Sequence, residues 1–147
     1  MKTLQAFCTI LLFICILIFI SYNVRADYNN IIVDKVVSVY DADSFFITQR
    51  NWPEIVGKRI GVRVNGVDSP EIRGKCKQEK EWAKVAKMYT FNALKNARYV
   101  ELKDVQRGKY FRILATVYID NINLADSLIA AGLGRAYNGG KRGGWCQ

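Results

Sequence analysis

The chain has 147 residues, enough for one domain, and half of them are hydrophobic. It contains no histidine, which excludes every mechanism that uses an imidazole as acid, base, nucleophile or zinc ligand. Any hydrolysis must therefore depend on carboxylates, arginine, lysine, tyrosine, or a metal ion bound through oxygen.

The first 26 residues have the pattern of a secretory signal peptide. Lys2 precedes an apolar run from Ala6 to Ile20, and the small residue Ala26 closes the segment. The run is shorter than the roughly 18 apolar residues that a membrane-spanning helix needs. We expect cleavage after Ala26, a single domain over residues 27–147, and export to the periplasm or the medium. An uncleaved membrane anchor is the alternative.

The remaining segment, residues 27–147, is basic. It keeps 20 basic and 13 acidic residues, a net charge of +7, because Lys2 and Arg25 leave with the signal segment. This excess favours a polyanionic partner, either nucleic acid or an anionic membrane surface, although many small exported proteins are simply basic. No obligate protein partner is indicated, and we expect a monomer.

Two cysteines, Cys76 and Cys146, remain after cleavage. In an oxidising compartment two cysteines usually pair. The alternative is two free buried thiols, which a cytosolic location would favour.

The first half of residues 27–147 has the pattern of a β-sheet. β-branched residues predict one strand over Ile31–Val39, and Ser44–Thr48 predicts a second after the turn at Asp41–Asp43. Alternation over Ile60–Val67 predicts a third strand, which Pro70 ends because proline cannot continue a β-ladder.

After Cys76 the pattern becomes helical. Apolar and aromatic residues recur at helical spacing among lysine, glutamate and asparagine residues: Trp82, Val85, Ala86, Tyr89 and Ala93. This spacing predicts an amphipathic helix of about five turns.

Two more strands and a short helix complete the predicted order. The strands are expected over Tyr99–Leu102 and Ile113–Ile119, and the helix begins at the N-cap Asn123 and ends at Gly132. Three strands, a helix, two strands and a helix fit a mainly β, α+β architecture, the five-stranded OB-fold barrel.

The acidic residues suggest a site for a hard cation. Asp41 and Asp43 lie at the bend between the first two strands, and Asp68 ends the third. Carboxylates brought together at one end of a barrel suit an ion such as Ca²⁺. Glu71, on the rigid loop after Pro70, could take a proton from water. Taken singly, each acid is more often a structural turn or surface residue.

Two arginines complete the candidate site. Arg63 interrupts the apolar alternation of the third strand, and Arg112 opens the strand that follows Lys109–Phe111. Phosphodiester cleavage passes through a negatively charged pentacovalent state, which planar guanidinium groups stabilise by paired hydrogen bonds. Arginines near strand ends are also common surface charges, so the acids and arginines must be considered together.

Together, three segments resemble the signature segments of the staphylococcal nuclease (thermonuclease) family. They are Val39–Ser44 (VYDADS), Arg63–Glu71 (RVNGVDSPE) and Lys109–Arg112 (KYFR). The barrel order and the second helix match as well, so the likeness covers nearly all of the chain after residue 30. The segment at 73–76 and the glycine-rich tail resemble the exported bacterial branch, whose two cysteines are placed to pair.

The resemblance implies a calcium site. Its ligands would be the carboxylates of Asp43 and Asp68 and the backbone carbonyl of Ser69, with Asp41 supporting them from behind. Ala42 stands where the family usually has glycine, and would restrict the turn if a positive φ were required there. Ser44 and Ser69 stand where threonine is common and keep the hydroxyl group.

The resemblance also implies catalytic roles. Glu71 would be the general base for the attacking water, and Arg63 and Arg112 would hold the scissile phosphate and stabilise its extra charge. Three further positions match substrate-binding residues of the family. Lys109 and Tyr110 would contact a terminal phosphate of the bound nucleotide, and Tyr137 would stack near a base.

The sequence therefore predicts a calcium-dependent nuclease that hydrolyses DNA and RNA with little sequence specificity, and the resemblance implies 3′-phosphate products. A non-catalytic OB-fold module that only holds single strands is the alternative. Such a module has no need of Glu71, Arg63 and Arg112 beside an acid cluster, which favours the enzyme. A membrane-tethered accessory protein is a third reading, if residues 6–20 stay attached.

Overall fold

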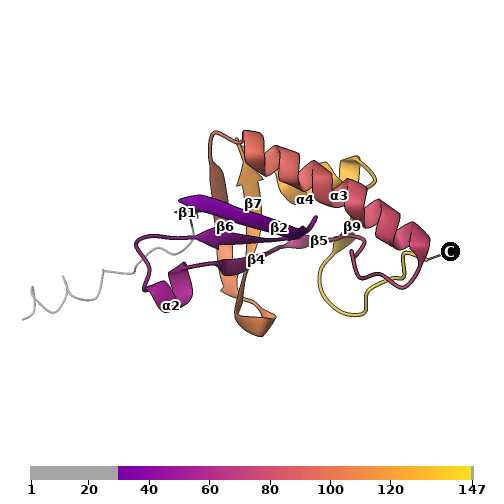
Figure 1. Ribbon diagram of the computed structural model, residues 1–147, viewed down its shortest axis with the longest axis horizontal. Helices are drawn as coiled ribbons and strands as arrows, with labels where there is room; N and C mark the ends of the chain where they lie inside the picture. Colours follow the sequence, from indigo (N-terminus) through magenta and orange to yellow (C-terminus); the bar gives the residue numbers. More distant parts are fainter. Residues whose placement is uncertain (1–29, 147) are drawn as a thin grey trace, which may run out of the picture.

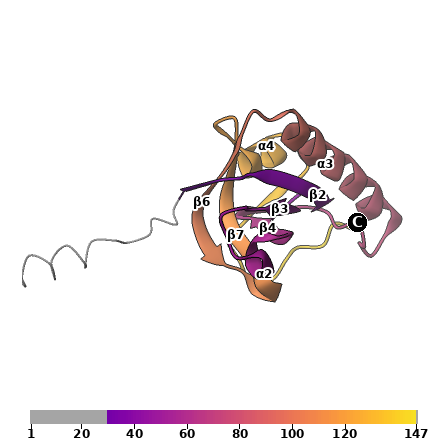
Figure 2. The same ribbon diagram turned by 60° about the vertical axis from the view of Figure 1, so that its left-hand side comes forward.

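The computed structural model describes residues 30–146, so the predicted signal segment lies outside the described residues. Among residues 30–146, none of the helices has the length and apolar character that a bilayer-spanning segment requires. The chain forms a strongly curled, half-barrel sheet with the long helix α3 lying across one end of it, as Figures 1 and 2 show from two sides. This is the predicted mainly β, α+β architecture of the OB-like type.

The predicted first three strands form an antiparallel meander, but the first has a break. β2 (Lys35–Asp41), β3 (Ser44–Thr48) and β4 (Ile60–Val64) pair in sequence. Ahead of β2, a separate strand β1 (Asn30–Ile32) pairs with β6 instead. The single strand expected over Ile31–Val39 is thus wrong, because Asp34 turns out of the ladder and its carboxylate accepts the backbone N–H of Arg50 at 2.7 Å.

The predicted third strand also divides. β4 ends at Val64, Gly66 takes a positive φ of 84°, and β5 (Gly66–Asp68) leaves the large sheet. β5 pairs with β9 (Arg135–Tyr137), a short strand that the sequence pattern did not predict. Glycine suits this bend because it lacks the Cβ that disfavours positive φ. The bend directs Asp68 toward the C-terminal segment.

The predicted amphipathic helix is α3 (Lys77–Asn96), and it packs against β2. Its buried side includes Ala83, Ala86, Thr90 and Leu94, which recur at the three- and four-residue spacing of one helix face. The predicted apolar face is thus wrong in part, because Trp82, Val85 and Tyr89 are exposed. The Thr90 hydroxyl donates to the carbonyl of Ala42 at 2.8 Å and so ties the helix to the turn between β2 and β3.

The second half of the sheet follows α3. β6 and β7 pair antiparallel, and β7 then lies parallel to β4, which gives the strand order β1-β6-β7-β4-β3-β2 with β8 paired to β7. The predicted short helix is α4, whose N-cap Asn123 accepts the backbone N–H groups of Ala125 and Asp126. The remaining elements are α2 (Glu54–Gly57), β6 (Val100–Arg107), the 3₁₀ turn η1 (Lys109–Phe111), β7 (Arg112–Ile119), β8 (Ile122–Asn123) and α4 (Leu124–Ala130).

The concave side of the sheet, with α3 and α4, encloses one apolar core. Its most deeply buried large side chains are Phe45, Ile47, Val62, Val64, Val67, Leu102, Val117, Leu124 and Leu128. They come from β3, β4, β5, β6, β7 and α4, so the core fixes the relative positions of the strand ends that carry the candidate site.

Candidate active site

Asp43 is held at the turn between β2 and β3 by residues from two segments. One oxygen, Oδ2, accepts both the backbone N–H of Ser69 at 2.9 Å and the Ser69 hydroxyl at 2.8 Å. The other, Oδ1, accepts the hydroxyl of the neighbouring Ser44 at 3.0 Å. Asp43 is almost fully buried, and these bonds compensate the loss of its hydration. The serines at positions 44 and 69 therefore make the bonds that fix this carboxylate.

Ala42 lies at this turn without the backbone strain that a positive φ would cause. It is fully buried and is not among the described residues with positive φ. Any L-residue can adopt its backbone conformation, so the turn does not require glycine. Next to it, Asp41 accepts the backbone N–H of Ile72 at 3.2 Å, and burial raises the pKa of its carboxyl.

Arg63 brings a buried positive charge between two of the acids. Its guanidinium forms an ion pair with Asp43, lies 3.7 Å from Asp68 Oδ1, and donates to the carbonyl of Val67 at 3.0 Å. Burial lowers the pKa of Arg63 from its ordinary value to about 10, and the nearby charge of Arg142 acts in the same direction. The group is still cationic at neutral pH.

Asp68 ends β5 and is the point where the site meets the C-terminal segment. Its Oδ2 accepts the indole N–H of Trp145 at 3.2 Å. Within the part of the chain that the structure describes, its buried Oδ1 has no hydrogen-bond partner. The Arg142 Nε lies 3.1 Å from Oδ1, and so lies at ion-pair distance without the alignment of a hydrogen bond.

Glu71 lies on the loop between β5 and α3, partly open to solvent. Glu79, in the first turn of α3, shapes this loop because its carboxylate accepts the backbone N–H groups of Glu71 at 3.4 Å and Lys75 at 2.9 Å. Gly74 lies so close to Glu79 that an added Cβ would overlap the carboxylate. In this conformation Glu71 forms an ion pair with Arg142.

Arg112 and its neighbours occupy the adjacent strand. Arg112 opens β7 opposite Gly61 of β4, two residues before Arg63, and its charge contributes to the lowered pKa of Arg63. Before it, Lys109 and Tyr110 lie in η1, where Tyr110 has a positive φ of 57° and is 89% exposed. An aromatic ring presented to solvent beside arginine is available for stacking.

Tyr137 lies on β9, across from Gly66 of β5. Its hydroxyl donates to the carbonyl of Gly140 at 2.8 Å, and the Arg142 guanidinium lies over its ring at 6.0 Å. Tyr137 thus borders the site through its contacts with the tail.

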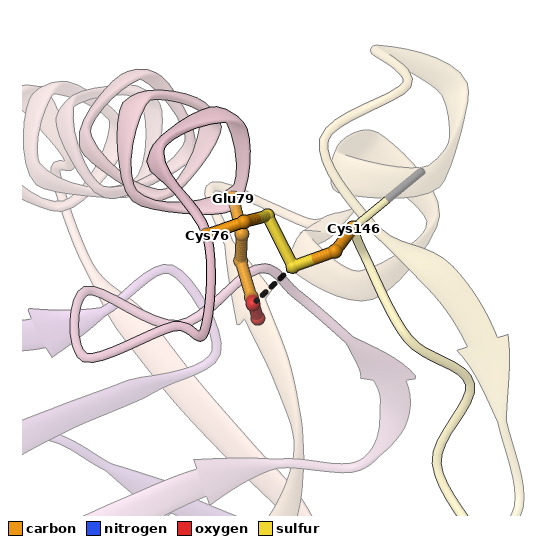
Figure 3. A group of neighbouring side chains, drawn as sticks. All are labelled: Cys76, Glu79 and Cys146. Atoms are coloured by element: carbon orange, nitrogen blue, oxygen red, sulfur yellow. Dashed lines mark hydrogen bonds between the residues drawn. A yellow bond between two sulfur atoms is a disulfide. The ribbon is translucent and has the colours of Figure 1, made fainter.

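A disulfide joins Cys76, which precedes α3, to Cys146 at the end of the tail. The Cα atoms are 5.9 Å apart, within the roughly 7 Å that a disulfide allows. Figure 3 shows the Glu79 side chain pointing at this bond, with its Oε2 3.6 Å from Cys146 Sγ. Cys76, Glu79 and Cys146 bring three potential metal ligands within 4.8 Å, but the two sulfurs are bonded to each other and are not available to a metal.

The structure adds to the site three residues that the sequence interpretation did not assign to it: Glu79, Arg142 and Trp145, of which Trp145 was expected only to pack the tail against the barrel. All three contact the candidate acids or their loop. Only Trp145 had a signal in the sequence, since it adjoins Cys146 in a glycine-rich tail. The contacts of Glu79 and Arg142 depend on the loop and tail conformations.

The donor set of the site fits a hard divalent cation. Asp43 and Asp68 are buried carboxylates on adjoining chain segments, and Asp68 Oδ1 is a buried acceptor without a hydrogen bond among the described residues. Buried acceptors are nearly always satisfied by hydrogen bonds, and within residues 30–146 this oxygen has only the unaligned cations Arg142 and Arg63 beside it, so it can still accept a ligand bond. All-oxygen ligation with flexible geometry is typical of Ca²⁺.

The curled sheet, with carboxylates and arginines at the ends of its strands, defines a small OB-like α+β protein. The family model described as staphylococcal nuclease homologue matches residues 61–143, more than half of the chain. The chain belongs to the family of staphylococcal nuclease homologues. Comparison with curated proteins gave no match.

Family membership indicates a nuclease-type or nucleic-acid-binding function, and the family is typically calcium-dependent. The matched range contains Arg63, Asp68, Glu71 and Arg112, and begins after Asp43. The hydrogen bonds from Ser69 to Asp43 connect the turn before the matched range to the loop inside it.

Proposed function

We propose that this chain is a calcium-dependent nuclease that hydrolyses phosphodiester bonds in DNA and RNA with little sequence specificity. The observation that carries the proposal is a chain of ion pairs centred on Asp68. Arg63 lies between Asp68 and Asp43. Arg142 pairs with both Asp68 and Glu71. A carboxylate ligand, a general base and a buried guanidinium at one strand end are the groups that phosphodiester hydrolysis without histidine needs.

Each residue has a role that its surroundings support. Asp43, Asp68 and the carbonyl of Ser69 would hold the calcium ion, which when bound supplies a positive charge to the phosphate oxygens. Glu71, partly solvent-exposed, would take a proton from the attacking water.

The two arginines would act on the phosphorus centre. Arg63 and Arg112 lie on neighbouring strands and would donate to the non-bridging oxygens as negative charge develops there. The bond from phosphorus to the 5′ oxygen would break, leaving a 3′-phosphate and a 5′-hydroxyl that takes its proton from solvent.

Arg142 must move for this reaction. In the described conformation it pairs with both Glu71 and Asp68, so it holds the base and a candidate metal ligand together. Its side chain is 41% exposed, so rotation toward solvent breaks few packing contacts. If Asp68 is to hold the ion, its ion pair with Arg142 must break, and the same movement of Arg142 would release Glu71.

A binding-only OB module is the competing function. The exposed Tyr110 ring and the net charge of +7 over residues 27–147 would serve binding and catalysis equally. Binding alone, however, gives no reason to bury Arg63 between Asp43 and Asp68, since buried ion pairs are costly to desolvate.

The test is incubation of the purified protein with single-stranded DNA and with RNA, in calcium and in a calcium chelator. We expect cleavage in calcium, none in chelator, and 3′-phosphate ends on the products. Binding without cleavage in calcium would favour the binding module, and undiminished cleavage in chelator would contradict the metal assignment.

We also propose that the protein is exported, with residues 1–26 removed, and acts as a monomer. The support is the signal-like pattern before Ala26 and the disulfide, which is stable in oxidising compartments. The N-terminal sequence of the mature protein and its mass in solution test these points. A retained residue 1 would instead support the membrane-tethered alternative.

A further inference from the structure

The C-terminal tail, residues 138–146, is exposed along most of its length, yet Trp145 is only 6% exposed. Its ring packs edge-on against Trp82 of α3, with centroids 6.2 Å apart and an interplanar angle of 87°. On another side the Arg135 guanidinium lies 3.8 Å from the ring, and the same arginine donates to the carbonyl of Gly144 at 2.9 Å. One aromatic side chain is thus placed by contacts from two elements, α3 and β9.

The polar end of Trp145 meets Asp68. Its indole N–H donates to Asp68 Oδ2 at 3.2 Å, which leaves Oδ1 buried and without a hydrogen bond among the described residues. The indole N–H is a donor only, so it can neither ligate a metal ion nor accept a proton. The contact therefore fixes the rotation of the Asp68 carboxylate and holds Oδ1 out of hydrogen-bond alignment with the neighbouring arginines.

Two cations lie near the other oxygen of Asp68, even with this bond in place. The Arg63 guanidinium lies 3.7 Å and the Arg142 Nε 3.1 Å from Oδ1. A carboxylate free to rotate would align with these cations, and its oxygens would be engaged when a metal ion arrives. Hydrogen bonds that orient a ligand group in this way strongly affect metal affinity.

The tail depends on the disulfide for its position. Cys146 is the residue after Trp145, and its bond to Cys76 fixes the tail to the start of α3 (Figure 3). Four glycines, Gly139, Gly140, Gly143 and Gly144, precede it, so the tail has little conformational preference of its own.

From these contacts we infer that Trp145, held by the Cys76–Cys146 disulfide, is a positioning residue that orients Asp68 for calcium. The inference rests on the proposed function, because it takes Asp68 as a metal ligand. Trp145 touches neither the candidate base nor the arginines that would contact phosphate, so its effect should fall on calcium and not on the substrate.

The test compares Trp145→Phe with Trp82→Phe by calorimetric titration of calcium into the full mature protein. Trp145→Phe keeps an aromatic ring and removes the N–H, and we expect calcium affinity to fall by about 10–100-fold. Trp82→Phe alters the same aromatic pair without touching Asp68, and should bind calcium as the wild type does. Circular dichroism at the titration temperature shows that each variant is folded.

Enzyme kinetics provide a second readout. For Trp145→Phe, the calcium concentration for half-maximal rate should rise, while saturating calcium restores kcat and KM for DNA stays at the wild-type value. Equal calcium affinity in folded Trp145→Phe and wild type would overturn the inference and leave the proposed function standing. A wild-type protein that binds no calcium would overturn both, and equal losses in the two variants would show a packing role only.

Discussion

Arg63 and Asp43 form a buried ion pair that joins β4 to the turn between β2 and β3, with side-chain exposures of only 10% and 6%. Asp43 is also bound by Ser69, so Arg63 takes part in a network that spans three chain segments. This pair makes Arg63 structural as well as a candidate for phosphate binding, which separates it from Arg112.

Arg63→Ala and Arg112→Ala should therefore differ in stability although both lose activity. Removing one partner of a buried ion pair typically costs about 3–5 kcal/mol, so we expect a loss of that order in the unfolding free energy of Arg63→Ala. Arg112 forms no such pair within the described residues, and its removal should leave stability nearly unchanged. Urea unfolding and DNA cleavage rates test this, with Arg98→Ala as an exposed-arginine control. Equal stability of the two variants would contradict the structural role of Arg63.

Glu71→Gln should slow cleavage by about 10²–10⁴-fold, the usual contribution of a general base. The amide keeps the size of the side chain but cannot take a proton from water, so substrate binding should persist. The measurements are single-turnover cleavage and equilibrium binding of the same DNA. Glu81→Gln, which removes an exposed glutamate from α3, is the matched control. A near-normal rate for Glu71→Gln would place the base elsewhere.

Calcium should stabilise the fold against unfolding by mass action. A ligand that binds only the native state adds about 2.7 kcal/mol at one hundred times its Kd. We expect the melting temperature to rise with calcium and the rise to disappear in Asp68→Asn, which lacks the carboxylate. Differential scanning calorimetry with calcium, with magnesium and with chelator gives the readout. An unchanged calcium effect in Asp68→Asn would rule out Asp68 as a ligand.

The fold was largely predictable from the sequence because its signals are local. Alternation marked the strands, helical spacing marked α3, and Asn123 marked the start of α4. The errors fell where tertiary contacts override local pattern. Asp34 leaves the first strand to bind Arg50, and β9 forms only because β5 bends away at Gly66.

The candidate site was predictable to a similar extent and for the same reason. The acids and arginines occur in short segments around strand ends, so their convergence follows from the predicted barrel order. Arg142 was not predictable, because its ion pairs with Asp68 and Glu71 depend on the path of a glycine-rich tail. Periodicity carries no information about such a segment.

Asp34→Asn should destabilise the protein at neutral pH and do so less in acid. Hydrogen bonds from the backbone and side chain of Arg50 lower the pKa of the Asp34 carboxyl below its ordinary 3.8. A lowered folded-state pKa contributes stability above the unfolded-state value, and that contribution is lost as pH falls through the folded-state pKa. The difference in unfolding free energy between wild type and Asp34→Asn should therefore shrink below pH 3.8. Asp104→Asn is the control for overall charge, and a difference independent of pH would contradict the prediction.

Loss of the Cys76–Cys146 disulfide should destabilise the fold and expose the tail. The bond spans a sequence separation of 70 residues. In the chain-entropy model, a loop of that length contributes on the order of 4 kcal/mol by restricting the unfolded chain. The double variant Cys76→Ser with Cys146→Ser should lose an amount of this order in urea unfolding, and Trp145 fluorescence should shift toward that of a solvated indole. Trp52→Phe and Trp82→Phe in the same background leave Trp145 as the only tryptophan in the sequence, so the fluorescence change reports on the tail. Titration of the mature exported protein should find no free thiol, and two free thiols in the folded protein would contradict the pairing.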